Sequence, residues 1–201
     1  IFTKNNKEKQ KYNFKIFGNP LSHNPNPKFL GVTFDQHLNF KEQTNYIRQK
    51  TISRLNMIKI LSHKSYKLSK KTLLSVYRSV VGSILDYNFF ILPFISKTNL
   101  KKLQTIQNKA VRCIFKLHLD PDTQRPHSSD FLNKLSSLPS VSERMLELKD
   151  SYIAQAQLNK NPLICPLIIN YKRNASTIDR RGVPTLLTGA NLNLLEIANY
   201  L

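Results

Sequence analysis

The sequence predicts a mainly α-helical protein with a small β element near its amino end, and so an α+β chain. Around residue 38 the spacing of apolar residues changes from near two to about 3.6, which marks a change from strands to helices. Of the 201 residues, 40% are hydrophobic, which is enough to bury a core. We expect a short β-hairpin or sheet remnant over residues 1–36, a helical bundle over 37–119, and a looser, irregular helical region with a tail over 120–201.

Two segments predict the β element. Residues Tyr12 to Phe17 alternate aromatic or apolar with polar side chains, and Gly18-Asn19-Pro20 follows as a turn. The second segment runs from Lys28 to Phe34, and its centre is continuously apolar, as in a strand that is covered on both faces. This pattern places Phe29 and Leu30 in the core.

Three helices are predicted in the bundle from apolar residues that recur every three or four positions. The first, about residues 41–61, carries one stripe of Ile47, Thr51, Leu55, Ile58 and Leu61. The second has Ser69 as its N-cap and runs to about Asp86, and its apolar face is Leu73, Leu74, Tyr77, Val80, Val81, Ile84 and Leu85. The third runs from about residue 97 to 117, and its apolar face, which we expect to point into the core, is Leu103, Ile106, Ala110, Cys113 and Ile114.

The segments around these helices are less regular. The aromatic residues after the second helix are expected to join the core rather than to stack on bases: Tyr87, Phe89, Phe90 and Phe94. Residues 119–126 read as a loop, 130–135 as a short helix and 142–158 as a longer one. The run "PLIINY" at residues 166–171 resembles a strand.

The charge of the chain is concentrated in its middle. The formal net charge is +19, and residues 36–119 hold sixteen Lys and Arg against two acids, whereas residues 120–201 hold nine against eight. A strongly basic region favours polyanionic partners, of which nucleic acid is the first candidate and an anionic membrane the second. The membrane is disfavoured because the third helix lacks Trp and bulky exposed apolar residues beside its lysines.

The third helix predicts where phosphates would bind. Its cations project from one side within about 80° of arc, and residues 87–119 contain no acid to neutralise them. We therefore expect phosphate contacts from Lys101, Lys109, Arg112 and Lys116, with Thr105 and Asn108 among them as neutral donors. The first helix adds Arg48 and Lys59.

Other chemistries find little support in the sequence. Cys113 and Cys165 lack the spacing of zinc ligands and are expected to be reduced thiols, and the five histidines are scattered. No nucleophile–base pair is visible, and we expect no cofactor or metal to be bound by this chain. Without an apolar run near the roughly 20 residues that cross a bilayer, we expect an intracellular protein, in the nucleus or the cytoplasm. Because the chain starts at Ile1, we interpret it as a fragment.

Three segments in a fixed order resemble a known family. They read "KFLGVTFDQHLNF", then "LSKKTLLSVYRSVVGSILDYNFFI", then "SKTNLKKLQTIQNKAVRCIF". This order resembles the carboxy-terminal part, the palm end plus the thumb, of reverse transcriptases from jockey-like non-LTR retrotransposons. The matching motifs are residues 28–35, 73–87 and 100–112, and Leu138-Pro139 with Arg144 looks like the region just after the family's thumb.

The resemblance implies a fragment of an RNA-directed DNA polymerase that helps to bind the primer/template duplex, together with the remainder of the parent polymerase. The expected partner is an RNA–DNA hybrid or another nucleic-acid duplex. It places Gly31 at the primer-grip end of a palm, where a backbone without a side chain can approach the primer terminus; a glycine fitted against a neighbouring helix is the alternative. The parent enzyme is expected to use Mg, held by an adjacent pair of aspartates.

No Asp-Asp pair occurs in the sequence, and the nearest approach, Asp120-Pro121-Asp122, reads as turn acids. We therefore expect no catalytic residue here and no activity from this chain alone. The alternative is a stand-alone basic nucleic-acid-binding module without polymerase activity.

Overall fold

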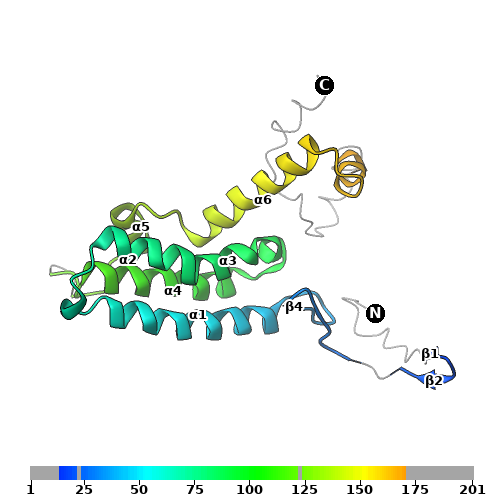
Figure 1. Cartoon of the computed structure of the whole chain (residues 1–201), viewed down its shortest axis with the longest axis horizontal. Helices are drawn as coiled ribbons and strands as arrows, with labels where there is room; N and C mark the ends of the chain where they lie inside the picture. Colours follow the sequence, from blue (N-terminus) through cyan, green and yellow to red (C-terminus); the bar gives the residue numbers. More distant parts are fainter. Residues whose placement is uncertain (1–13, 22–23, 122–123, 171–201) are drawn as a thin grey trace.

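Two β-hairpins precede a bundle of helices in the computed structural model, which describes residues 14–21, 24–121 and 124–170 (Figure 1). The predicted fold class, mainly α with a small β element, is confirmed. The start of the first predicted strand and the tail after residue 170 lie outside the described residues.

Each hairpin has strands of two residues and a two-residue turn. Strand β1 (Lys15–Ile16) pairs antiparallel with β2 (Asn19–Pro20), and β3 (Lys28–Phe29) pairs with β4 (Val32–Thr33). The turns are Phe17-Gly18 and Leu30-Gly31, and all four residues have positive φ, as a type I′ turn requires. The predicted continuous strand from Lys28 to Phe34 is therefore wrong, because the chain reverses at Leu30-Gly31.

The reversal also changes what the apolar run contacts. Phe29 is 66% exposed and Leu30 is 74% exposed, whereas Val32 is buried. Placing Phe29 and Leu30 in the core was wrong. A hairpin this short turns only part of its apolar sequence towards the bundle, and the backbone of β4 packs against α1.

Helix α1 (Lys41–Leu61) has the predicted bounds, and its stripe is buried except for the half-buried Leu61. After a 3₁₀ turn, η1 (Lys64–Tyr66), the chain returns as α2 (Lys70–Tyr77), a π-helical turn η2 (Arg78–Gly82) and α3 (Ser83–Tyr87). Ser69 caps α2 as predicted, since its side chain accepts from the Thr72 N–H. The single regular helix predicted there is interrupted by the π turn.

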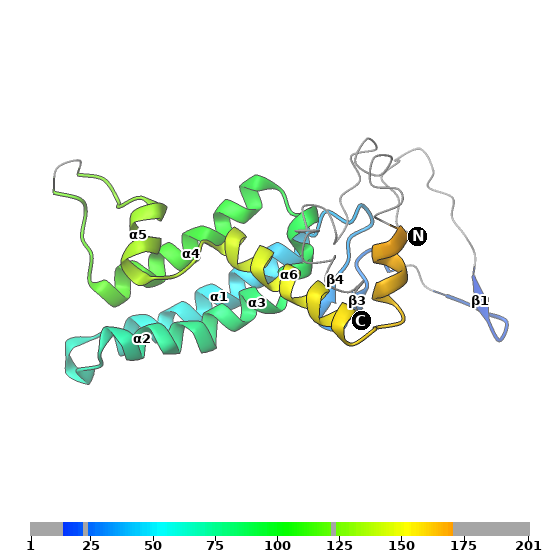
Figure 2. The same ribbon diagram turned by 90° about the horizontal axis from the view of Figure 1, so that it is seen from above.

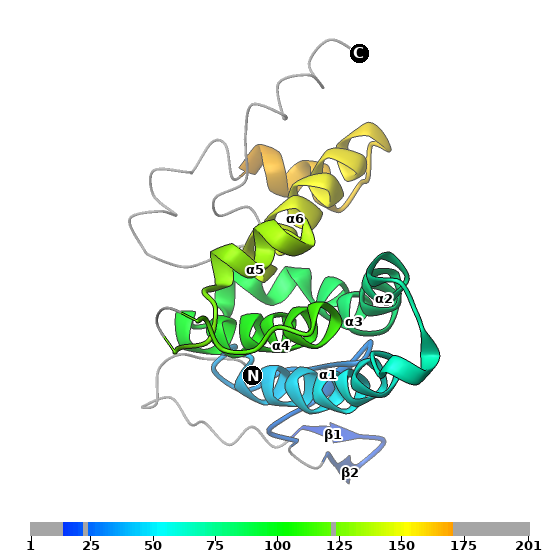
Figure 3. The same ribbon diagram turned by 90° about the vertical axis from the view of Figure 1, so that its left-hand side faces the viewer.

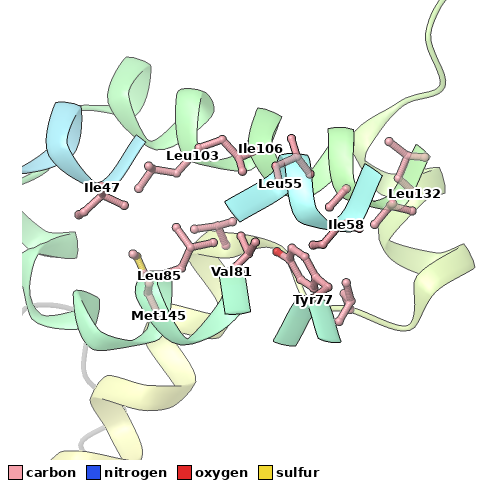
Figure 4. Close-up of a cluster of buried hydrophobic side chains, with 14 of the residues drawn as sticks. Ile47, Leu55, Ile58, Tyr77, Val81, Leu85, Leu103, Ile106, Leu132 and Met145 are labelled. Carbon is pink, nitrogen blue, oxygen red and sulfur yellow. The ribbon is translucent and has the colours of Figure 1, made fainter. Parts of the chain in front are cut away.

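The core lies where α1, the α2–α3 segment and α4 (Lys97–Phe115) meet. A 3₁₀ helix, η3 (Phe89–Phe94), joins α3 to α4. Figure 4 shows the facing apolar side chains, among them Ile47, Leu55, Ile58, Tyr77, Val81, Leu85, Leu103 and Ile106. Burial of this surface is the main driving force for assembling the bundle.

Two further helices pack on the side of the bundle away from α1 (Figure 3). Helix α5 (Ser129–Ser136) lies on α4, and α6 (Val141–Leu158) crosses α3 and η3 and then extends beyond the bundle (Figure 2). Both were predicted to within one or two residues. The strand-like run after Pro162 is wrong, because residues 164–170 are helical. Asn161 explains this, since its side chain accepts from the backbone N–H groups of Leu163 and Ile164 and so caps the helix.

Across the described residues, no helix has the length and apolar character needed to cross a membrane.

Candidate nucleic-acid interface

Helices α1 and α4 lie side by side and run in the same direction (Figure 1). The pKa of Cys113 on α4 is raised by burial and lowered to a smaller extent by the charge of Lys59 on α1. Because α1 rises about 1.5 Å per residue, Arg48 lies about 16 Å from Lys59 along this helix. Both side chains are exposed, so α1 carries two cations on its surface.

Five exposed cations on these two helices are called the seam cations: Arg48 and Lys59 from α1, and Lys101, Lys109 and Lys116 from α4. Arg48 and Lys59 differ by only about 20° around the axis of α1, so they project from one flank. Lys101 and Lys109 are about 80° apart on α4, with the exposed Thr105 between them. Lys116 follows the last residue of α4 as its C-cap, in the left-handed region at φ 55°.

Two residues predicted to join this ridge do not. Arg112 is half-buried and donates from Nη2 to the backbone oxygen of His127 at 2.9 Å. Asn108 is buried and donates from Nδ2 to Ser129 Oγ at 2.8 Å. The prediction that they project openly is wrong, because α5 and the loop before it cover that side of α4.

The positive charge of the seam cations is not neutralised by nearby acids. Only Glu42 and Asp86 are acidic between residues 36 and 119, and Asp86 is paired with Arg144 at 3.0 Å. None of the ion pairs formed within the described part of the chain includes a seam cation. A surface of this kind has a positive potential that attracts polyanions.

Gly31 lies at the other end of the bundle, where α1 begins. Its φ of 79° is the reason that the turn needs glycine, and a Cβ placed there would lie 3.9 Å from the Tyr87 hydroxyl oxygen. The Tyr87 hydroxyl donates to the backbone oxygen of Leu30 at 2.6 Å. This geometry agrees with the alternative interpretation of Gly31, a glycine that packs against a neighbouring helix. Gly31 therefore lies at the end of the bundle away from Lys59, Lys109 and Lys116.

The hairpin is also tied to the bundle by a polar chain that the sequence did not reveal. The Thr33 N–H donates to Gln43 Oε1 at 2.9 Å, and Gln43 Nε2 donates to Asn88 Oδ1 at 2.9 Å. Both amide side chains are buried. A Gln at position 43, in line with the buried stripe of α1, is the signal that could have indicated a buried polar contact.

The aromatic residues near α3 divide into two groups. Phe89, Phe90 and Phe94 are half-buried against the core, as predicted, and the ring of Phe94 lies 5.5 Å from that of Phe40. Tyr87 is 58% exposed, so its expected place in the core was wrong, and its hydroxyl holds the hairpin instead.

No group of three or more His, Cys, Asp or Glu side chains that could hold a metal ion occurs among the residues the structure describes. Cys113 and Cys165 are free thiols. His127 stacks on Phe131, with ring centroids 4.8 Å apart, and its Nδ1 lies 3.5 Å from an Asp120 carboxylate oxygen.

Comparison with known proteins confirms the resemblance predicted from the sequence. The chain is 25% identical over 165 residues to the RNA-directed DNA polymerase from mobile element jockey of Drosophila funebris. The aligned residues make up 82% of this chain and 17% of that protein. It is 26% identical over 87 residues to the probable RNA-directed DNA polymerase from transposon BS of Drosophila melanogaster, covering 43% of this chain and 10% of that protein. The chain thus spans less than a fifth of the length of these relatives. No family model and no solved structure matches.

Proposed function

We propose that this chain is part of an RNA-directed DNA polymerase of a non-LTR retrotransposon, in which its helical bundle acts as a thumb that binds the primer/template duplex. The observation that carries the proposal is the seam of exposed cations on α1 and α4, which no nearby acid neutralises. The names of the two relatives supply the polymerase context.

The seam suits a ligand whose sequence changes at every catalytic step. Lysine and arginine side chains contact phosphates without reading base edges, so their contacts are independent of sequence. The distance from Arg48 to Lys59 along α1 is about 16 Å, which corresponds to about five base pairs at 3.4 Å per step. The five seam cations can therefore contact about half a turn of duplex.

The chemical step is assigned to another part of the parent protein. Nucleotidyl transfer uses two metal ions held by carboxylates, and such a set is absent from the described residues, while the full sequence has no Asp-Asp pair. We propose that the Mg ions of the parent enzyme are bound outside the described residues, and that this chain alone does not extend a primer.

The test is the salt dependence of binding to an RNA–DNA hybrid. The seam variant changes Lys59, Lys101, Lys109 and Lys116 to Gln, which is nearly as good a helix former as Lys. If each lysine meets one phosphate, the slope of log K against log salt shrinks by about three to four units between about 50 and 200 mM salt. The hybrid sequence should have little effect on affinity.

A control variant removes the same charge elsewhere, by changing the exposed Lys15, Arg125, Lys134 and Lys160 to Gln. The control should change the slope by less than about one unit. Equal slopes for the folded seam variant and the wild-type chain would show that the seam is only a solvated surface. Primer extension by the wild-type chain would refute the assignment of chemistry to another part of the protein.

A further inference from the structure

The connection between α1 and α2 forms a second basic surface, at the end of the bundle opposite the β-hairpins (Figures 1 and 2). Four lysines occur there within eight residues, and all four are exposed; Lys64, Lys67, Lys70 and Lys71 are called the tip lysines. No acidic residue occurs between Glu42 and Asp86. The tip lysines therefore lie outside the predicted contact residues and have no acidic neighbour in their own segment.

The tip is held in one conformation by its own hydrogen bonds. His63 caps η1 by accepting from the Ser65 N–H at 3.3 Å, and Ser69 caps α2 by accepting from the Thr72 N–H at 3.1 Å. The ammonium of Lys70 lies 5.1 Å from the centre of the Phe115 ring, so it stays close to the end of α4. Like charges that occur within eight residues of one segment repel, and an anion bound among them would relieve the repulsion.

An exposed aromatic residue lies between two of these lysines. Tyr66 is 54% exposed and is preceded by Lys64 and followed by Lys67. None of the hydrogen bonds or ring contacts within the described residues uses its side chain. An exposed ring among cations is the pattern with which proteins bind unpaired strands, since every nucleobase can stack on it.

We propose that the tip binds single-stranded RNA or DNA, with phosphates at Lys64, Lys67 and Lys71 and one unpaired base stacked on Tyr66. Paired bases are already stacked inside the duplex and cannot reach Tyr66, so the aromatic ring favours an unpaired strand over a duplex. This site goes beyond the duplex binding assigned to the seam. It does not depend on the polymerase context.

The absence of tryptophan from the chain provides a direct assay. Tyr66→Trp gives the full chain a single tryptophan, at an exposed position. An oligouridylate of about 12 nucleotides, within the size range of single-strand sites, is the probe. Binding should quench the tryptophan emission, whereas a blunt duplex of the same length should leave it unchanged. Unchanged emission at saturating oligouridylate would overturn the proposal.

Tyr46→Trp is the matched control fluorophore. Tyr46 is 41% exposed on α1, and the ammonium groups of Lys28 and Lys50 lie 5.4 and 5.7 Å from its ring centre. It therefore shares the exposure and the cationic neighbours of Tyr66 but lies outside the tip. Oligouridylate should quench Tyr66→Trp and not Tyr46→Trp. Equal quenching of both would mean that stacking is not specific to the tip.

Substitutions in the otherwise wild-type chain separate stacking from charge. Tyr66→Ala should weaken oligouridylate binding by about 5- to 150-fold, and Tyr66→Phe should restore it, because the ring and not the hydroxyl makes the contact. Changing Lys64, Lys67 and Lys71 together to Gln should reduce the salt slope for a single strand by about two units. Removing Lys15, Lys134 and Lys160 instead should leave the slope nearly unchanged.

The tip and seam proposals fail separately. If only the seam exists, the tip variants bind oligouridylate as the wild-type chain does, and the tip proposal is refuted. If only the tip exists, its variants lose oligouridylate binding while the seam variant keeps its hybrid-duplex salt slope.

Discussion

Gln43→Ala tests the polar chain that fixes the β3–β4 hairpin to the bundle. Gln43 is 1% exposed, and its side chain joins the backbone of Thr33 to the side chain of Asn88. Truncation removes both hydrogen bonds. Asn88 keeps its bond from Nδ2 to the Ile84 oxygen, but its own Oδ1 loses the partner provided by Gln43.

The cost follows from which groups lose their partner. The Asn88 oxygen is buried, and an unsatisfied buried acceptor costs about 1–3 kcal/mol. The Thr33 N–H is half-buried, so water can replace part of its bond. One lost buried methylene adds about 0.8 kcal/mol, and the higher helix propensity of Ala returns a few tenths. We expect Gln43→Ala to lower the free energy of unfolding by about 2–3 kcal/mol.

The measurement is urea unfolding followed by far-UV circular dichroism. Gln49→Ala is the control, because Gln49 is an exposed glutamine on the same helix, and it should change the free energy of unfolding by less than about 0.5 kcal/mol. Gln43→Ala and Asn88→Ala combined should show a coupling of about 1 kcal/mol. Equal stabilities for the two glutamine variants, or no coupling, would mean that the amide pair does not hold the hairpin in place.

Four further predictions concern single residues. Burial raises the pKa of Tyr77, so above about pH 10 the unfolded chain releases this proton first and stability falls as pH rises; absorbance at 295 nm should show one tyrosine that ionises only on unfolding. Gly31→Ala should destabilise by about 1 kcal/mol because of its positive φ, whereas Gly82→Ala, which has ordinary contacts and lies inside a helix, should be neutral or stabilising in thermal melts. Ser140→Ala should cost about 1 kcal/mol in urea unfolding by removing the cap of α6. Hydrogen bonds from Ser140 lower the pKa of Glu143, so the contribution of this carboxylate is present above about pH 4.5 and is lost as the pH falls through the lowered pKa.

The helices could be predicted because their signals are local. The stripe of α1 and the Ser69 cap of α2 lie within a few residues of the structure that they specify. The π turn at Arg78–Gly82 could not be predicted. The buried residues Tyr77, Val81 and Leu85 are four positions apart, and this spacing also fits a regular α-helix.

The β3–β4 hairpin was not predicted because its turn lacks the usual sequence signal. Leu30-Gly31 adopts positive φ at both positions, for which Asn-Gly is the common sequence. An apolar residue followed by Gly within an apolar run looks like the middle of a buried strand. Only the contacts with Tyr87 and Gln43, from distant parts of the chain, reveal that the run reverses.

The candidate interface was predicted in part for a related reason. Helical periodicity gives the direction of a side chain from its own axis, and so it indicated the side of α4 that carries Lys101 and Lys109. It does not give which neighbouring element covers that side. Arg112 and Asn108 share the direction but lie at the edge that α5 and its preceding loop cover, and both became structural donors.

Helix α1 sets the spacing between the surfaces that we propose. Its 21 residues span about 30 Å, with the hairpin at its start and the tip just after its end. A duplex that contacts the seam from Arg48 to Lys59 would cover about five base pairs at 3.4 Å per step before it reaches the tip. Only a nucleic acid that changes from paired to unpaired at about that distance can engage the seam and the tip together. Because two linked contacts strengthen binding without new interactions, such a junction should bind more tightly than a blunt duplex or a single strand of equal length, and its advantage should disappear when either the tip lysines or the seam lysines are changed to Gln.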